Sequence, residues 1–118
     1  MKDERLYLIH IAECFERIVQ YTENGRDEFL TDIKTQDAVI RNFEIIGEAV
    51  KRISDDTRNL APEMPWRQLA GFRDVLIHQY DGIDPMEVWQ TVEKELPVFQ
   101  PIIARLLQEM DKTNGGKN

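Results

Sequence analysis

Apolar residues recur at steps of three and four along nearly the whole chain, which is the spacing of amphipathic helices. The pattern predicts long helices over about 3–22, 33–54, 65–79 and from Asp84 onward. Turn-forming pairs, Asn24-Gly25 and Asp81-Gly82, separate these runs. A short helix is expected within 26–35, and a loop is expected over 55–65, where polar residues and two prolines gather.

The last predicted helix carries the most regular apolar stripe. It opens with Asp84-Pro85, a pair typical of a helix N-cap and first turn. Its apolar positions are Trp89, Val92, Leu96, Phe99, Ile103, Leu106 and Met110. Pro97 and Pro101 fall inside the stripe, and each removes a backbone donor and clashes with the preceding turn. We therefore expect a kink or break near 93–97, with both halves of the helix facing one core.

This pattern predicts the fold class. The chain shows neither strand alternation nor an internal repeat, and short connections join its helices. We expect an all-α, antiparallel up-down four-helix bundle whose last helix is kinked or split. Residues 1–112 are expected to form a single domain, and 113–118 a disordered tail. Gly47 lies beside the apolar stripe of its helix and leaves space for a neighbouring backbone.

Composition narrows the function. The 118 residues include 15 Lys+Arg and 22 Asp+Glu, which gives a net charge of −7. This charge argues against a protein that binds nucleic acid through a broad basic surface. It does not exclude a few arginines in a cleft. One cysteine and two histidines cannot build a zinc cluster. No apolar run is long enough to span a membrane, and charges within the first 19 residues exclude a signal-peptide core. We expect a cytoplasmic protein without a membrane partner.

The residues best suited to chemistry lie between Gly71 and Tyr80. On a regular helix, Arg73 and Tyr80 lie about 20° apart around the axis, whereas His78 lies about 140° from Arg73. The three residues therefore form no simple stripe. Either the helix loosens near its end, or the site is completed from elsewhere, for example by a second subunit.

These side chains suit metal-free cleavage of a phosphodiester. Arg73 can hold a phosphate through two donors, Tyr80 can stack or form a hydrogen bond, and His78 can donate or accept a proton. An RNA 2′-hydroxyl would supply the nucleophile, so no serine or cysteine is needed. The ordinary alternative is a histidine that caps the helix and an arginine in a salt bridge.

Glu44 and Glu48 lie one helical turn apart on the predicted helix over 33–54. Such a pair could bind a metal or act as base and acid. The ordinary interpretation is a solvated helix face or a partner for arginine, such as Arg41 or Arg52.

Arg73-x4-His78-x-Tyr80 resembles the R-x4-H-x-Y motif of HepT-like toxins in the HEPN superfamily. The segment 41–49, Arg-Asn-Phe-Glu-Ile-Ile-Gly-Glu-Ala, resembles that family's second-helix motif, and the passage from Trp66 to Trp89 resembles its third-to-fourth helix region. The resemblance covers about residues 3 to 110. One departure is Asp74, which stands at a position after the arginine where asparagine is also common. As an acidic neighbour, Asp74 is expected to reduce the positive potential near the arginine.

The resemblance implies a HEPN-like bundle that forms a homodimer, with two copies of Arg73 and His78 as catalytic residues in a shared cleft. It implies a metal-independent endoribonuclease that needs no cofactor and is the toxin of a toxin–antitoxin pair. The antitoxin would be an MNT-type minimal nucleotidyltransferase that transfers AMP to Tyr80, which otherwise contacts substrate. Asp74, Glu44 and Glu48 would support the site, with a carboxylate of the second helix orienting Arg73.

Two other classes of function stay open. In one, the chain is a non-catalytic nucleotide- or substrate-binding subunit of a nucleotidyltransferase, in which Arg73 and His78 bind phosphate. In the other, it is a structural dimer in which the motif is silent.

Overall fold

All regular elements of the described residues, 4–78 and 82–115, are helices in this computed structural model. They are α1 (Glu4–Tyr21), α2 (Arg26–Thr31), α3 (Ile33–Lys51), α4 (Asp55–Arg58), α5 (Trp66–His78), α6 (Pro85–Gln90), the π-helix η1 (Thr91–Glu95) and α7 (Leu96–Gly115). The all-α class is confirmed, and the long helices agree closely with the predicted ranges. The expected loop over 55–65 is wrong in one detail, because it contains the single turn α4, capped by the Ser54 side chain.

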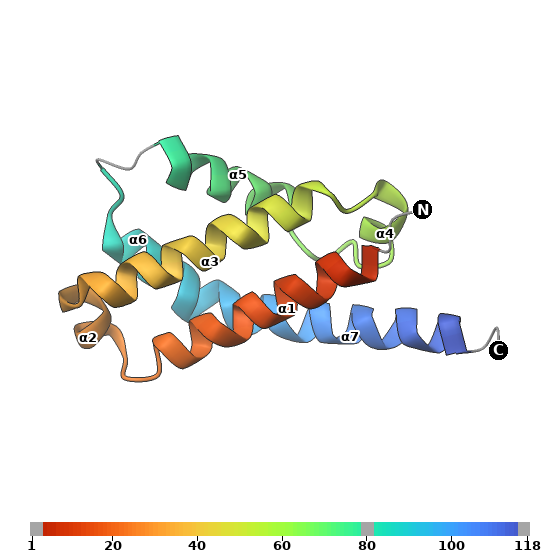
Figure 1. The fold of residues 1–118 in the computed structure, drawn as a ribbon, viewed down its shortest axis with the longest axis horizontal. Helices are drawn as coiled ribbons and strands as arrows, with labels where there is room; N and C mark the ends of the chain where they lie inside the picture. The colour runs from red at the N-terminus through yellow and green to blue at the C-terminus, as the bar shows by residue number, and fades with distance from the viewer. Residues whose placement is uncertain (1–3, 79–81, 116–118) are drawn as a thin grey trace.

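The long helices run alternately in opposite directions, as predicted for an up-down bundle (Figure 1). Helix α3 lies between α1 and α5 and packs extensively against both, while α7 packs along α1 (Figure 1). The main partner of α5 among the described elements is α3. The position of α5, and of every residue on it, therefore depends on its contact with α3.

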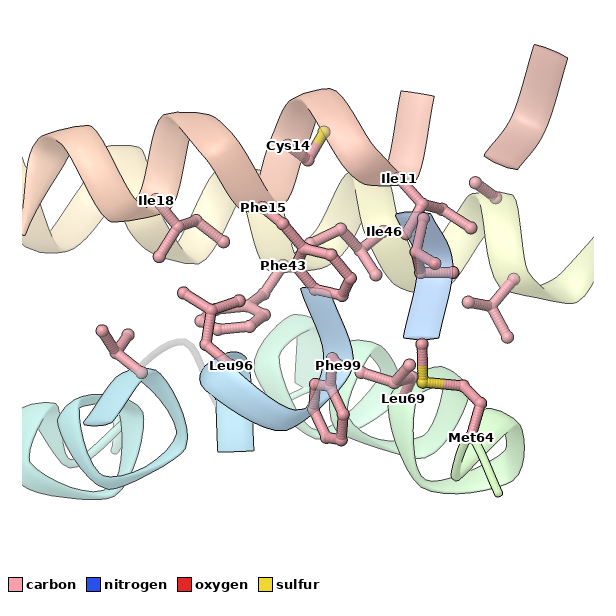
Figure 2. Packing of buried hydrophobic residues seen from close by; sticks show 14 of the residues in the cluster. Ile11, Cys14, Phe15, Ile18, Phe43, Ile46, Met64, Leu69, Leu96 and Phe99 are labelled. Carbon is pink, nitrogen blue, oxygen red and sulfur yellow. The ribbon is translucent and has the colours of Figure 1, made fainter. Parts of the chain in front are cut away.

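The core consists of apolar side chains that come from all the long helices (Figure 2). Phe15 of α1 faces Phe99 of α7, with ring centres 6.1 Å apart, and Phe43 of α3 meets Phe72 of α5 edge-on at 5.2 Å. The Trp66 indole is buried and donates a hydrogen bond of 3.1 Å to the carbonyl of Ala61. This bond fixes the start of α5 against the preceding loop.

The irregularity expected near 93–97 takes the form of a π-helix. In η1 the backbone N–H of Leu96 donates to the carbonyl of Thr91, five residues earlier, immediately before Pro97. A proline clashes with the carbonyl four residues before it, and the wider π turn relieves that crowding. The apolar phase survives, since Val92, Leu96, Phe99, Ile103 and Leu106 are all buried.

Gly47 allows α3 and α5 to approach closely at Arg73. A Cβ atom built on Gly47 would lie 2.1 Å from the Cβ of Arg73 and 3.2 Å from the carbonyl oxygen of Leu69. Neither atom belongs to the flexible end of a side chain, so any larger residue would have to move α5 away from α3. The space that the sequence predicted beside Gly47 is thus occupied by the Cβ and Cγ atoms of Arg73.

We expect Gly47→Ala to lower the free energy of unfolding by about 1–3 kcal/mol, as overpacking does. This loss should appear although alanine favours a helix by about 1 kcal/mol over glycine. Urea denaturation measures the change. Gly71→Ala on α5 is the matched control: apart from its chain neighbours and its own helix backbone, no atom of the described residues lies within 4 Å of the new Cβ, so this variant should gain about 0.5–1 kcal/mol. A Gly47→Ala chain as stable as the parent would contradict the close approach.

Candidate functional site

Arg73 occupies the contact between α5 and α3, with a side chain that is 26% exposed. Its Nη2 lies 3.0 Å from Oε2 of Glu48, and its Nη1 lies 3.2 Å from Oδ1 of Asp74. The Nε atom is buried and meets no hydrogen-bond acceptor among the described residues. Two carboxylates and the tight packing at Gly47 therefore hold the guanidinium in one place.

These contacts belong to a longer row of alternating charges across α3 and α5, which we call the charge row: Arg52, Glu48, Arg73, Asp74 and Lys51. The Lys51 ammonium lies 2.7 Å from Oδ1 of Asp74, and Nη2 of Arg52 lies 3.8 Å from Oε1 of Glu48. Three cations thus face two carboxylates. The row has a net charge of +1 and a cation at each end, in a chain whose net charge is −7.

Asp74 shows the electrostatic effect of this arrangement. Its pKa is lowered below 3.8, chiefly by the hydrogen bond from Lys51 and then by the hydrogen bond from Arg73. The carboxylate stays ionised and opposes the charge of Arg73. The departure noted in the sequence therefore has the predicted direction, since Asp74 reduces the positive potential at the arginine.

The two glutamates of α3 differ in their partners. Glu48 contacts Arg73, and the orienting role that the resemblance implies for a carboxylate of this helix stays a prediction. Glu44 instead pairs with Arg41, at 3.5 Å. Both glutamates are thus partners for arginine, which is the ordinary interpretation given to them from the sequence.

An open pocket of about 260 Å³ lies beside Arg73. Residues of α1, α3 and α5 line it, together with the residue that caps α3: Tyr7, His10, Arg41, Glu44, Ile45, Glu48, Ala49, Arg52 and Arg73. Sequence reasoning did not identify Tyr7, Arg41 or Arg52 as site residues. A signal existed, because charged residues at 41, 44, 48 and 52 follow the three-and-four spacing of one helix face.

His78 is the last residue of α5, five positions after Arg73 on a continuous α-helix. Positions so spaced are separated by about 140° around the axis, as expected from the sequence. The His78 side chain and the whole of Tyr80 lie outside the described residues. The structure thus brings Glu48 and Asp74 to Arg73, and Glu44 lines the pocket together with Glu48 and Arg73.

Chemically, this site is suited to binding an anion. A guanidinium offers five donors, and Arg73 uses two of its nitrogens on carboxylates, so a phosphate must compete with Glu48 or Asp74 or use the remaining donors. In residues 4–78 and 82–115, no group of three His, Cys, Asp or Glu side chains is arranged to hold a metal ion. Nor does any helix in that part of the chain have the length and apolar character of a membrane span.

Comparison with known proteins gave consistent results. A family model described as "Ribonuclease HepT-like" matches residues 11–106. "Probable ribonuclease HepT" of Thermococcus cleftensis is 51% identical over 92 residues, which is 77% of this chain and 84% of that protein. "Gamma-glutamylcyclotransferase and putative RNase MJ0434" of Methanocaldococcus jannaschii is 40% identical over 117 residues. The match covers 98% of this chain but only 53% of that relative, so the chain spans about half its length. No solved structure matches the chain significantly.

We expect NMR titration of the Asp74 carboxyl carbon to give a pKa below 3.8, and Lys51→Met to raise it, because the Lys51 hydrogen bond is the largest cause of the shift. A lowered folded-state pKa means that this group's contribution to stability is present above its unfolded pKa. The contribution is lost as the pH falls through the lower, folded value. Lys94→Met, in η1, is the control and should leave Asp74 unchanged. An unchanged Asp74 pKa in Lys51→Met would contradict the charge row.

Proposed function

Because this chain belongs to the HepT-like ribonuclease family, we propose that it is a metal-independent endoribonuclease and the toxin of a toxin–antitoxin pair. The observation that carries the proposal is the family match over residues 11–106, which includes the whole motif from Arg73 to Tyr80. The position of Arg73 in an anion-suited pocket supports the same function.

In the proposed reaction the RNA 2′-oxygen attacks the adjacent phosphorus, and the bond from phosphorus to the 5′-oxygen breaks. The proton of the 2′-hydroxyl leaves to a base, and the departing 5′-oxygen takes up a proton. His78 is the group proposed to move protons, since imidazole exchanges them near neutral pH. Arg73 holds the phosphate as negative charge builds on its oxygens. The products are a cyclic phosphate and a free 5′-hydroxyl.

The carboxylates around Arg73 have a supporting role in this proposal. Glu48 and Asp74 fix the guanidinium before RNA arrives, so little reorganisation is needed when phosphate binds. They also reduce its positive charge, which favours transient contact with RNA over a tight grip. Glu44 acts one step further away, through Arg41.

We further propose that the active form is a homodimer in which α5 meets α5 of a second copy. The face of α5 near Phe72 borders a groove of about 330 Å³, which is also lined by Gln68, Leu69, Thr91, Glu95 and Phe99. Val75, farther along α5, is 43% exposed. A second copy covering this region would bring two motif segments together and supply the side of the cleft that the 140° separation leaves open.

Regulation by an MNT-type nucleotidyltransferase antitoxin completes the proposal. The Tyr80 oxygen would attack the α-phosphorus of ATP, lose its proton and release pyrophosphate. An added AMP two residues from His78 would occupy the phosphate site and repel RNA by its charge.

A second candidate is a non-catalytic binding subunit of a nucleotidyltransferase. The pairing of Arg73 with two carboxylates is the ordinary arrangement of a structural arginine and favours a chain without catalysis. The two candidates differ in RNA turnover. A silent structural dimer would lack both turnover and nucleotide binding.

We expect the purified chain with unmodified Tyr80 to cleave RNA in the presence of a metal chelator, and His78→Ala to lower the rate about 10²-fold or more, the usual effect of losing an acid–base group. Gel analysis of labelled RNA measures the rate. Arg26→Gln, on α2, is the control and should retain the parental rate, because Arg26 is 58% exposed and does not line the pocket beside Arg73. A His78→Ala chain that cleaves as fast as the parent would show that His78 has no such role.

Co-expression with an active MNT-type nucleotidyltransferase should raise the intact mass of the chain by one or more AMP groups. Tyr80→Phe should abolish the shift, since it removes the attacking oxygen. Tyr21→Phe is the control, because Tyr21 is 42% exposed and lies outside the motif, and it should shift as the parent does. An unshifted parental mass, or a shift that persists in Tyr80→Phe, would refute modification at this residue.

A further inference from the structure

We propose that the pocket beside Arg73 binds a second phosphate group of the RNA strand at Arg52, and that Arg41, farther along α3, contacts the strand as well. This inference rests on the proposed function and extends it to residues outside the R-x4-H-x-Y motif. Residues of α1 and α3 line most of the pocket, together with Arg73 of α5 and with Arg52, which caps α3. RNA held at Arg73 would therefore have a continuous path along α3 toward Arg52.

The first observation is the local charge. Three arginines, Arg41, Arg52 and Arg73, line the pocket against two glutamates. The chain as a whole has a net charge of −7. A positive surplus within an acidic protein concentrates anions at that position and directs them away from the remaining surface.

The second observation is that Arg52 is held in place. Its guanidinium carbon lies 6.0 Å from the centre of the Tyr7 ring, a cation–π distance, and its Nη2 lies 3.8 Å from Glu48. The side chain is still 50% exposed, so donors remain available to a ligand. An arginine that is positioned before binding loses less conformational freedom when an anion arrives.

The third observation is the connection between Arg52 and Arg73. Both contact the same carboxylate, since Oε1 of Glu48 faces Arg52 and Oε2 faces Arg73. The two guanidinium groups are thus separated by no more than one carboxylate and its two contacts. Successive phosphates along a nucleic acid strand present charges at a comparably short repeat, so neighbouring phosphates of one strand can contact the two arginines together.

Arg41 extends the pocket in the other direction. It lies on α3 with a side chain that is 71% exposed, and its partner Glu44 is 3.5 Å away. A surface pair of this kind contributes little to stability, so Arg41 can exchange Glu44 for a phosphate at low energetic cost. Its neutralisation should also leave folding intact, which makes it a useful second variant.

The test measures binding of a fluorescent 2′-O-methyl RNA oligonucleotide, which lacks the attacking hydroxyl and stays intact. By anisotropy, we expect Arg52→Gln to weaken binding about tenfold, as loss of a charged hydrogen bond does. The slope of log Kd against log salt should fall by about one. Arg41→Gln should act in the same direction. Arg26→Gln makes the same charge change outside the pocket and should leave both quantities unchanged.

Three competitors identify the ligand. Inorganic phosphate and AMP carry one phosphate site each, and we expect both to compete weakly with the oligonucleotide. Equal competition by AMP would overturn the RNA assignment in favour of a free nucleotide. Equal competition by an oligoglutamate peptide would overturn it in favour of an acidic partner protein.

This binding test separates the inference from the proposed function. If Arg52→Gln and Arg41→Gln both bind the oligonucleotide as the parent does, while unfolding normally in urea, the second phosphate site is refuted whether or not the chain cleaves RNA. If both variants weaken binding but the parent leaves unmodified RNA intact, the site stands and the ribonuclease proposal fails.

Discussion

The close contact of Gly47 with the Cβ and Cγ atoms of Arg73 is the constraint on which the rest of the site depends. Helix α5 packs mainly on α3, and the 2.1 Å that a Cβ at Gly47 would leave to the Cβ of Arg73 shows how closely the helices meet there. This approach brings the Arg73 guanidinium to Glu48, on the same helix as Gly47 and one residue later. A missing side chain on one helix thus fixes the position of a charged group on another.

The charge row explains how an acidic protein can present an anion site. Lys51 and Arg52 lie at the C-terminal end of α3, and the two carboxylates between the cations keep them at defined spacing. Most of these side chains are about half exposed, so screening by water and salt keeps each pair weak. The row contributes geometry more than stability, which would suit the proposed binding and release of a polyanion.

The helices and several details of the site followed from the sequence because they depend on local rules. Periodicity predicted the four long helical segments, Pro97 predicted the irregularity at η1, and Gly47 predicted a close neighbour. The sequence did not predict which glutamate contacts Arg73. Glu44 and Glu48 share one helix face, and only the packing of α5 on α3 distinguishes them.

The sequence also did not predict that α1 contributes to the pocket. Tyr7 and Arg52 are far apart along the chain, and their contact arises from the way that α1 lies across α3. The pairing of Lys51 with Asp74 joins two helices in the same way. Such contacts depend on tertiary structure, for which residue spacing within one helix gives no rule.

The shared carboxylate of Glu48 has a thermodynamic consequence. Oε1 and Oε2 serve different arginines, so an anion that draws Arg52 away leaves Glu48 to Arg73 alone, and displacement of Glu48 from Arg73 frees it for Arg52. Ligands at the two arginines would therefore be energetically coupled. By linkage, a ligand at either arginine would alter the affinity of a ligand at the other by the same factor. Glu48 would carry this coupling between the two positions.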